Sequence, residues 1–287
     1  MQELIDRVRN SDILMPKGRT RPYVIEWLRS PGVGLDPPDF DDPDDGLYRL
    51  VQRRSGGLTY TLMPDKDIPR ILGVISDRIE RGFTGFDKKR DLVGFSGSNS
   101  FFNNCLKMEG QDLVRYAAIG GITCRIMLAT TPENARTLRI IEDLKQEPPK
   151  CSLTVAVEPG MQEIFKAFKT FPFLKGRVEL LGPYTHGDMS LSGTQEATAA
   201  LGLVDAIADI TQTGDTLDQN GLEEVANILN IVTCMGWPLG RDSYESFKLW
   251  NQDKNRVSRE RYREIFKWAG LVDADPFKEA KVEEKTT

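Results

Sequence analysis

The feature that most constrains the fold is an alternation of short apolar runs with segments of helical spacing. Ser11–Met15 is an apolar run that leads through a tight polar turn into a helical pattern ending near Leu28. The same order recurs at Ile122–Leu128 with the helical segment Pro132–Leu144, and again at Leu153–Val157 with Met161–Phe168. Strands that alternate with helices at this spacing are typical of βαβ units. We therefore predict an α/β fold with a parallel or mostly parallel sheet.

The remaining segments fit the same scheme. Further strands are expected at Leu47–Val51, Leu58–Leu62, Arg177–Leu181 and Val204–Ile210. Further helices are expected from Asp67, over Gln111–Ala118, over Gln195–Leu201, from Leu217, and over Arg259–Ala269. The loops Arg53–Gly57 and Asp36–Asp45 separate some of them, and the second is rich in proline and aspartate, which disfavour a helix.

Composition excludes several classes of protein. The 287 residues are 39% hydrophobic and 28% charged, which is enough apolar material for a core. The longest apolar stretch, Ala117–Thr130, is interrupted by Arg125 and is shorter than the ~18–20 residues that span a bilayer. Met1–Arg9 does not have the pattern of a secretory leader. We expect no membrane association and a cytoplasmic location.

Charge and rare residues narrow the chemistry further. The net charge of −5 argues against a general nucleic-acid binder. The single histidine, His186, excludes a histidine-rich metal site. The four cysteines form no CxxC pair, so we expect reduced, buried thiols and no protein-bound metal.

The most informative turn follows the strand expected at Val204–Ile210. Thr211–Thr216 contains three threonines, Gly214 and Asp215 directly before a helical segment. Backbone N–H groups and hydroxyls can donate to a phosphate there, the helix dipole favours an anion, and glycine allows close approach of the backbone. The turn is a candidate phosphate site, although it contains no lysine, and the simpler interpretation is a solvated strand–turn–helix connection.

Two carboxylates lie on the same face of that strand. Asp209 lies four residues before Thr213, close enough to accept hydrogen bonds from the hydroxyls of a ribose whose phosphate occupies the turn. Asp205 is four residues further back, ~13 Å along an extended strand. Asp205 therefore serves either the structure or another part of the ligand. The combination predicts a site for a ribose 5-phosphate.

Residues Ser192–Leu222 read SGTQEATAALGLVDAIADITQTGDTLDQNGL. This segment resembles the phosphoribosyl-diphosphate-binding signature of ATP phosphoribosyltransferases, the enzymes that open histidine biosynthesis. The matching elements are Ser-Gly-x-x-Glu, Asp-Ala-Ile-x-Asp, Thr-Gly-x-Thr-Leu and Asn-Gly-Leu. Upstream, and in the family's order, Pro16–Arg19 resembles the first strand-to-helix turn. Lys66–Pro69 and Thr84–Asp87 resemble the Asp-Ile-Pro and Thr-Gly-x-Asp segments.

The resemblance implies a two-lobed fold similar to the type II periplasmic-binding proteins, with a cleft between two α/β lobes and two crossings of the chain. Lobe one is then expected over residues 1–112 plus 223–270, lobe two over 113–222, and a disordered tail over 271–287. The residues after Leu222 are expected to contain a helix rather than the strands of a regulatory domain. The resemblance therefore implies a divergent member without the C-terminal regulatory domain.

The implied reaction is transfer of the phosphoribosyl group from phosphoribosyl diphosphate to N1 of ATP, with Mg²⁺ accompanying the diphosphate. Such chemistry depends on alignment and charge stabilisation, so it needs neither histidine nor cysteine. The expected catalytic residues are Lys17 and Arg19, which would face phosphates, together with Asp209. The expected substrate-binding residues are Ser192, Glu196, Asp205, Asp209, Thr213, Gly214, Asp215 through its backbone, and Thr216. The simpler interpretation of Lys17 and Arg19 is a solvated basic turn.

One position departs from the family. An arginine expected to stabilise the leaving diphosphate normally lies three residues before the aspartate of Asp-Ile-Pro, where this chain has Pro64. The candidate replacements are Lys66, Arg49, Arg53 and Arg54. Asp215 adds a negative charge to the turn, so a phosphate can bind there only if the Asp215 side chain points away from it.

Three functions therefore compete: an ATP phosphoribosyltransferase, an enzyme with the same donor but a different nitrogen acceptor in specialised metabolism, and a non-catalytic two-lobed binder or pseudoenzyme. The resemblance also implies homo-oligomers and, as in the family's compact form, a separate regulatory subunit.

Overall fold

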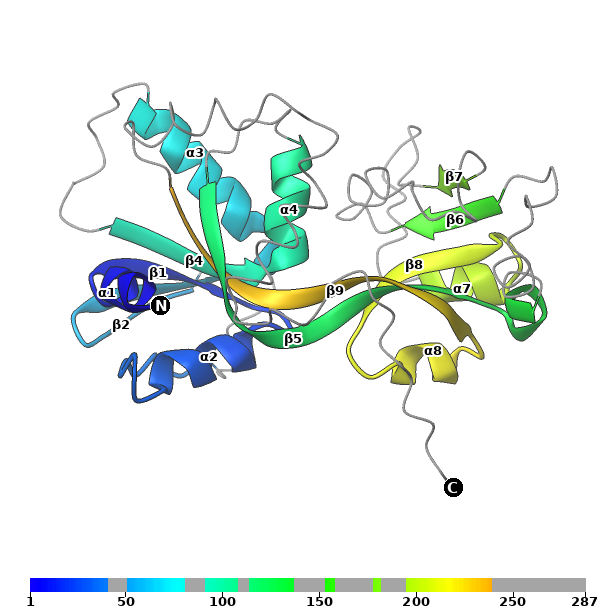
Figure 1. Cartoon of the computed structure of the whole chain (residues 1–287), viewed down its shortest axis with the longest axis horizontal. Coiled ribbons are helices and arrows are strands. Elements are labelled where there is room, and N and C mark those ends of the chain that lie inside the picture. The colour runs from blue at the N-terminus through cyan, green and yellow to red at the C-terminus, as the bar shows by residue number, and fades with distance from the viewer. Residues whose placement is uncertain are drawn as a thin grey trace. The chain divides into compact units, whose positions relative to one another are not determined.

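The computed structural model describes residues 1–40, 51–80, 91–107, 114–136, 153–157, 178–181 and 195–238 (Figure 1). The chain divides into two units, one formed by the described parts of Met1–Thr123 and by Val232 onward, the other by those of Cys124–Ile231. The divisions fall inside β5 (Val114–Thr130) and β9 (Glu223–Pro238), so the chain passes between the units in two strands. The sequence-based limits, residues 112 and 222, come just before these strands begin.

The first unit has the strand order β2-β3-β1-β4-β9. The strands are β1 (Ser11–Pro16), β2 (Val51–Ser55), β3 (Leu58–Met63), β4 (Asp91–Gly97) and β9. β1 pairs in parallel with both β3 and β4, whereas β2 and β9 are antiparallel to their neighbours. The helices are α1 (Gln2–Arg9), α2 (Arg21–Arg29), α3 (Ile68–Glu80) and α4 (Ser98–Lys107), and a short 3₁₀ turn, η1 (Asp65–Asp67), precedes α3. This is the expected α/β arrangement.

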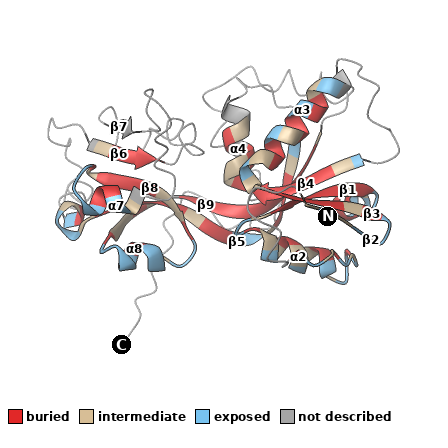
Figure 2. Ribbon diagram, turned by 180° about the vertical axis from the view of Figure 1, so that it is seen from behind, coloured by how far each residue is buried: buried red, intermediate tan, exposed pale blue. Residues whose placement is uncertain are grey.

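Burial explains why these segments fold as they do. β1 is flanked by strands on both sides, and Ile13 and Met15 are fully buried there. α2 begins beside a proline in its first turn and buries Val24 and Leu28, which lie four residues apart on one helix face. Figure 2 shows buried residues along the strands and exposed residues on the helices.

The second unit has the strand order β5-β8-β6-β7. Its elements are β6 (Leu153–Val157), β7 (Val178–Leu181), α7 (Gln195–Ala200), β8 (Ala206–Thr211) and α8 (Asp215–Gln219). β8 is antiparallel to β5 and parallel to β6. One face of this sheet forms a core in which Ile207 of β8 packs with Met127 of β5 and Leu217 of α8.

Several expectations are confirmed and some are wrong. The strands expected at residues 11, 58, 153, 177 and 204 are present as β1, β3, β6, β7 and β8, and the α/β fold class is confirmed. The helix expected over Gln111–Ala118 is wrong from Val114 onward, because those residues begin β5. Arg53–Ser55, expected in a loop, belong to β2, and the hairpin turn is Gly56-Gly57, both with positive φ.

Other elements had no counterpart in the sequence-based scheme. α1, β4, α4 and the long strand β9 were not expected, and β9 corrects the view that the residues after 222 contain no strand. The segments Met161–Phe168, Arg259–Ala269 and 271–287 lie outside the described residues, as do residues 41–45 of the loop Asp36–Asp45. No helix in the described ranges is long and apolar enough to cross a membrane.

Candidate active site

The basic turn lies at the carboxyl end of β1, in the first unit. Lys17 is half-buried, and Gly18 and Arg19 are exposed. The backbone N–H of Lys17 donates to the carbonyl oxygen of Met63 at 2.9 Å, which ties the turn to the end of β3. The carboxyl ends of parallel strands are where open α/β sheets place their ligand sites. The position suits the predicted role of Lys17 and Arg19.

A carboxylate that sequence reasoning missed holds this turn. The Asp65 Oδ1 accepts a hydrogen bond from the backbone N–H of Gly18 at 2.8 Å, and its Oδ2 accepts one from the hydroxyl of Thr20. The carbonyl oxygen of Asp65 accepts a third from Ser96 of β4 at 3.0 Å. Burial raises the pKa of the Asp65 carboxyl above its ordinary value, although the hydrogen bonds from Thr20 and Gly18 act in the opposite direction. Asp65 therefore joins the ends of three neighbouring strands.

The candidate phosphate turn lies between β8 and α8 in the second unit. Gly214 has φ 90° and ψ −7°, a left-handed conformation that favours glycine, and its N–H donates to Thr211 Oγ1 at 2.9 Å. Thr213, Asp215 and Thr216 are exposed. No other group comes within 4 Å of the Cβ position of Gly214. The turn is accessible to a ligand.

Asp215 does not point away from the turn. Its Oδ2 accepts a hydrogen bond from the hydroxyl of Thr213 at 2.8 Å, and its own N–H lies 3.4 Å from Thr213 Oγ1. A phosphate that took a hydrogen bond from the Thr213 hydroxyl would replace this contact.

Asp209 of β8 and Asp205, which directly precedes that strand, differ in their surroundings. Asp205, just before the strand, accepts a hydrogen bond from the backbone N–H of Thr154 at 2.7 Å, and its own N–H donates to the Thr154 carbonyl oxygen at 2.9 Å. These contacts support the structural alternative for Asp205. Asp209 lies near the turn, is half-buried, and pairs in register with Met127 of β5. Because Met127 and Ile207 share that face, Asp209 lies on the side that carries α8.

The other predicted residues fall in several places. Glu196 lies in the first turn of α7 and is half-buried. Ser192, His186 and Arg49 lie outside the described residues. Arg53 lies over the ring of Phe40, 5.6 Å from its centroid. Arg54, like Arg53, belongs to β2, whereas Lys66 is exposed in η1, the same turn as Asp65.

The fit of Mg²⁺ to this site depends on a single described carboxylate and on the phosphates of a substrate. In the part of the chain that the structure describes, no three His, Cys, Asp or Glu side chains form a cluster that could hold a metal ion. Mg²⁺ is often held by only one or two carboxylates together with substrate phosphates. Asp209, beside the phosphate turn, fits an ion that enters with the substrate.

Comparison with known proteins decides the family. The profile of the family described as ATP phosphoribosyltransferase matches residues 64–239, more than half of the chain. The chain belongs to the ATP phosphoribosyltransferase family. An ATP phosphoribosyltransferase of Thermococcus kodakarensis is 46% identical over 218 residues, which are 76% of this chain and 82% of the relative. The ATP phosphoribosyltransferase of Thermococcus gammatolerans is 27% identical over 218 residues, which again are 76% of this chain and 82% of the relative.

Among solved structures, the chain is similar to the "ATP phosphoribosyl transferase (HisG:HisZ) complex from Thermotoga maritima". The identity is 19%, the TM-score is 0.45, and the match covers 90% of this chain and 98% of that one. The profile match includes β4, α4 and β5.

Proposed function

We propose that the protein transfers the 5-phosphoribosyl group of phosphoribosyl diphosphate to N1 of ATP and releases diphosphate. The observation that carries the proposal is the turn Thr211–Thr216, in which Thr213, Asp215 and Thr216 are exposed and Gly214 is left-handed, directly after the strand that carries Asp209. A chain of this family that retains both a hydroxyl-rich turn and an adjacent acid has what a ribose 5-phosphate requires.

On the donor side, the hydroxyls of Thr213 and Thr216 and the backbone N–H of Asp215 bind the 5-phosphate. Asp209 accepts hydrogen bonds from the ribose hydroxyls, which places the anomeric carbon for attack. Ser192 and Glu196 belong to the same sugar-binding signature. Asp205 acts indirectly, because its hydrogen bonds with Thr154 fix the start of β8.

On the leaving-group side, Lys17 and Arg19 offset the negative charge that builds on the diphosphate as its bond to the anomeric carbon breaks. Lys66 is our candidate for the missing family arginine, because it is exposed in the turn that carries Asp65. Mg²⁺, when bound with the diphosphate, supplies further charge neutralisation, and Asp209 is the described residue best suited to contact it.

The test is a direct assay with the full chain, phosphoribosyl diphosphate, ATP and Mg²⁺. Mass spectrometry should detect phosphoribosyl-ATP, with one diphosphate released per product. Asp209→Ala should abolish turnover, and Asp218→Ala, a change at an exposed acid in α8, should leave it unchanged. If no phosphoribosyl-ATP forms but diphosphate is released with another nitrogen acceptor, that compound and not ATP is the acceptor.

The Pro64 departure is the observation that favours a second candidate, a binder without turnover. That function predicts tight binding of phosphoribosyl diphosphate and no diphosphate release with any acceptor. Homo-oligomers and association with a separate regulatory subunit stay predictions, and analytical ultracentrifugation of the purified chain tests the first.

A further inference from the structure

We infer that Arg125 of β5 is the cation that binds the sugar 5-phosphate in the turn Thr211–Thr216. The inference rests on the proposed function and names a residue outside the signature that predicted the site.

Strand register places Arg125 at this turn. Arg125 pairs directly with Thr211, the residue whose hydroxyl accepts the N–H of Gly214. Residues directly opposite each other in antiparallel strands have Cβ atoms about 4.5–5.5 Å apart, and long side chains also reach diagonal neighbours. The next pair on the same face is Met127 with Asp209. The arginine and the predicted ribose-binding acid therefore share one face of the sheet, beside the turn.

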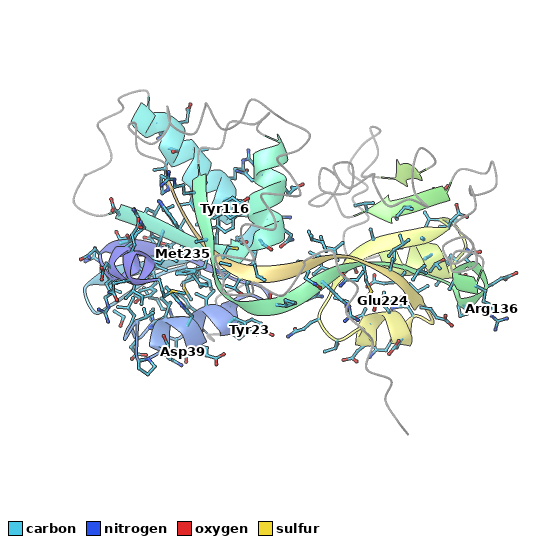
Figure 3. All side chains as sticks on the ribbon, viewed as in Figure 1. Tyr23, Asp39, Tyr116, Arg136, Glu224 and Met235 are labelled. Atoms are coloured by element: carbon cyan, nitrogen blue, oxygen red, sulfur yellow. The ribbon has the colours of Figure 1, made fainter. Side chains whose placement is uncertain are left out.

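Among the described residues of the second unit, the charge distribution points to the same residue. Its described residues include two cations, Arg125 and Arg136. The acids in the same ranges are Glu133, Glu179, Glu196, Asp205, Asp209, Asp215, Asp218, Glu223 and Glu224. A phosphate dianion among so many carboxylates needs a nearby positive charge. Arg136 is exposed, and Figure 3 shows it at the outer end of the unit, apart from Glu224.

Arg125 makes an ion pair with an acid of the neighbouring strand. Its Nη2 lies 2.7 Å from Oε2 of Glu224 in β9, and the two side chains are 32% and 29% exposed. Its Nε is buried and has no hydrogen-bond partner within the described ranges. A partly exposed ion pair adds modest stability, and an unsatisfied buried donor costs free energy. Because Glu224 belongs to β9, on the other side of β5 from β8, the guanidinium reaches the phosphate by turning away from this carboxylate. An arginine that can make this exchange is suited to bind a phosphate.

The experiment measures binding of ribose 5-phosphate, phosphoribosyl diphosphate and inorganic diphosphate to the full chain with Mg²⁺ by calorimetry. Arg125→Gln should weaken binding of the first two ligands about ten- to hundredfold, as loss of a charge-assisted contact predicts. It should leave the affinity for inorganic diphosphate unchanged. Arg125→Lys should fall between, because it keeps the charge without the planar fork. Arg136→Gln is the matched control and should bind all three like the wild type.

Glu224→Gln separates ligand binding from a structural ion pair. If Arg125 binds the phosphate, removing the competing carboxylate should leave ribose 5-phosphate binding unchanged or tighten it a few-fold. If the pair is only structural, Glu224→Gln should weaken binding as Arg125→Gln does, and the inference is overturned. Where Arg125→Gln alone fails to fold, the double variant Arg125→Gln/Glu224→Gln removes the unpaired acid and permits the same measurement.

Two failures remain distinguishable. A wild-type chain that binds no phosphoribosyl diphosphate overturns the proposed function and the inference with it. A wild-type chain that binds it, with Arg125→Gln binding equally well, overturns the inference alone.

Discussion

At the scale of single residues, Asp65 links the basic turn to the rest of the first unit. Asp65→Ala should lower kcat/KM about ten- to hundredfold, because the turn that carries Lys17 and Arg19 loses its anchor. Asp65→Asn should retain most activity, since its amide oxygen can accept from Gly18 and its amide nitrogen can donate to the Thr20 hydroxyl. Steady-state kinetics of both variants, with Asp67→Asn as control, test this. Equal losses in the alanine and asparagine variants would show that the charge, and not the anchoring, matters.

The same carboxyl makes a prediction about stability and pH. Because burial raises the pKa of Asp65, the folded state binds its proton more tightly than the unfolded state does. The contribution of this group to the free energy of unfolding is therefore largest below its ordinary pKa, near 3.8, and is lost as the pH rises through the higher folded value. Asp65→Asn should remove this downward slope. Urea unfolding of both proteins across the acidic range measures the difference, and parallel curves would contradict it.

At the scale of elements, the turn between β8 and α8 depends on the conformation of Gly214. Its φ of 90° is unfavourable for any residue with a Cβ, while the space around it is open. Gly214→Ala should lower the free energy of unfolding by about 1–2 kcal/mol. Gly121→Ala is the control, because that glycine of β5 also meets no neighbour but has no positive φ. The variants are compared by urea unfolding. A neutral Gly214→Ala would show that the turn can relax.

The elements also show what the sequence could predict. β8 was found because its aspartates alternate with apolar residues, and the phosphate turn because its residues match a local motif. β5 was taken for a helix at its start, because its burial does not alternate and Ala117 and Ala118 have helical propensity. Asp65 was missed because its partner Gly18 is 47 positions away, and no local pattern marks such a contact.

At the scale of the whole molecule, the two units are not independent lengths of chain. The first unit contains residues from both sides of the second, and β5 and β9 each continue through the point where the units divide. β4, in the first unit, pairs with β9 across Gly94–Gly97 and thus needs a strand that follows the second unit in the sequence. Unfolding of either unit should therefore disrupt strands that the other unit shares.

Two buried cysteines report on this coupling. Cys124 lies in β5 within the second unit, and Cys234 lies in β9 within the first. Burial raises the pKa of the Cys234 thiol, so the native protein should resist alkylation there. If the shared strands make unfolding cooperative, both cysteines should become reactive at the same urea concentration. Pulsed alkylation followed by peptide mass spectrometry measures the two midpoints. Reaction of Cys124 at clearly lower urea, with Cys234 still protected, would show that the second unit unfolds alone.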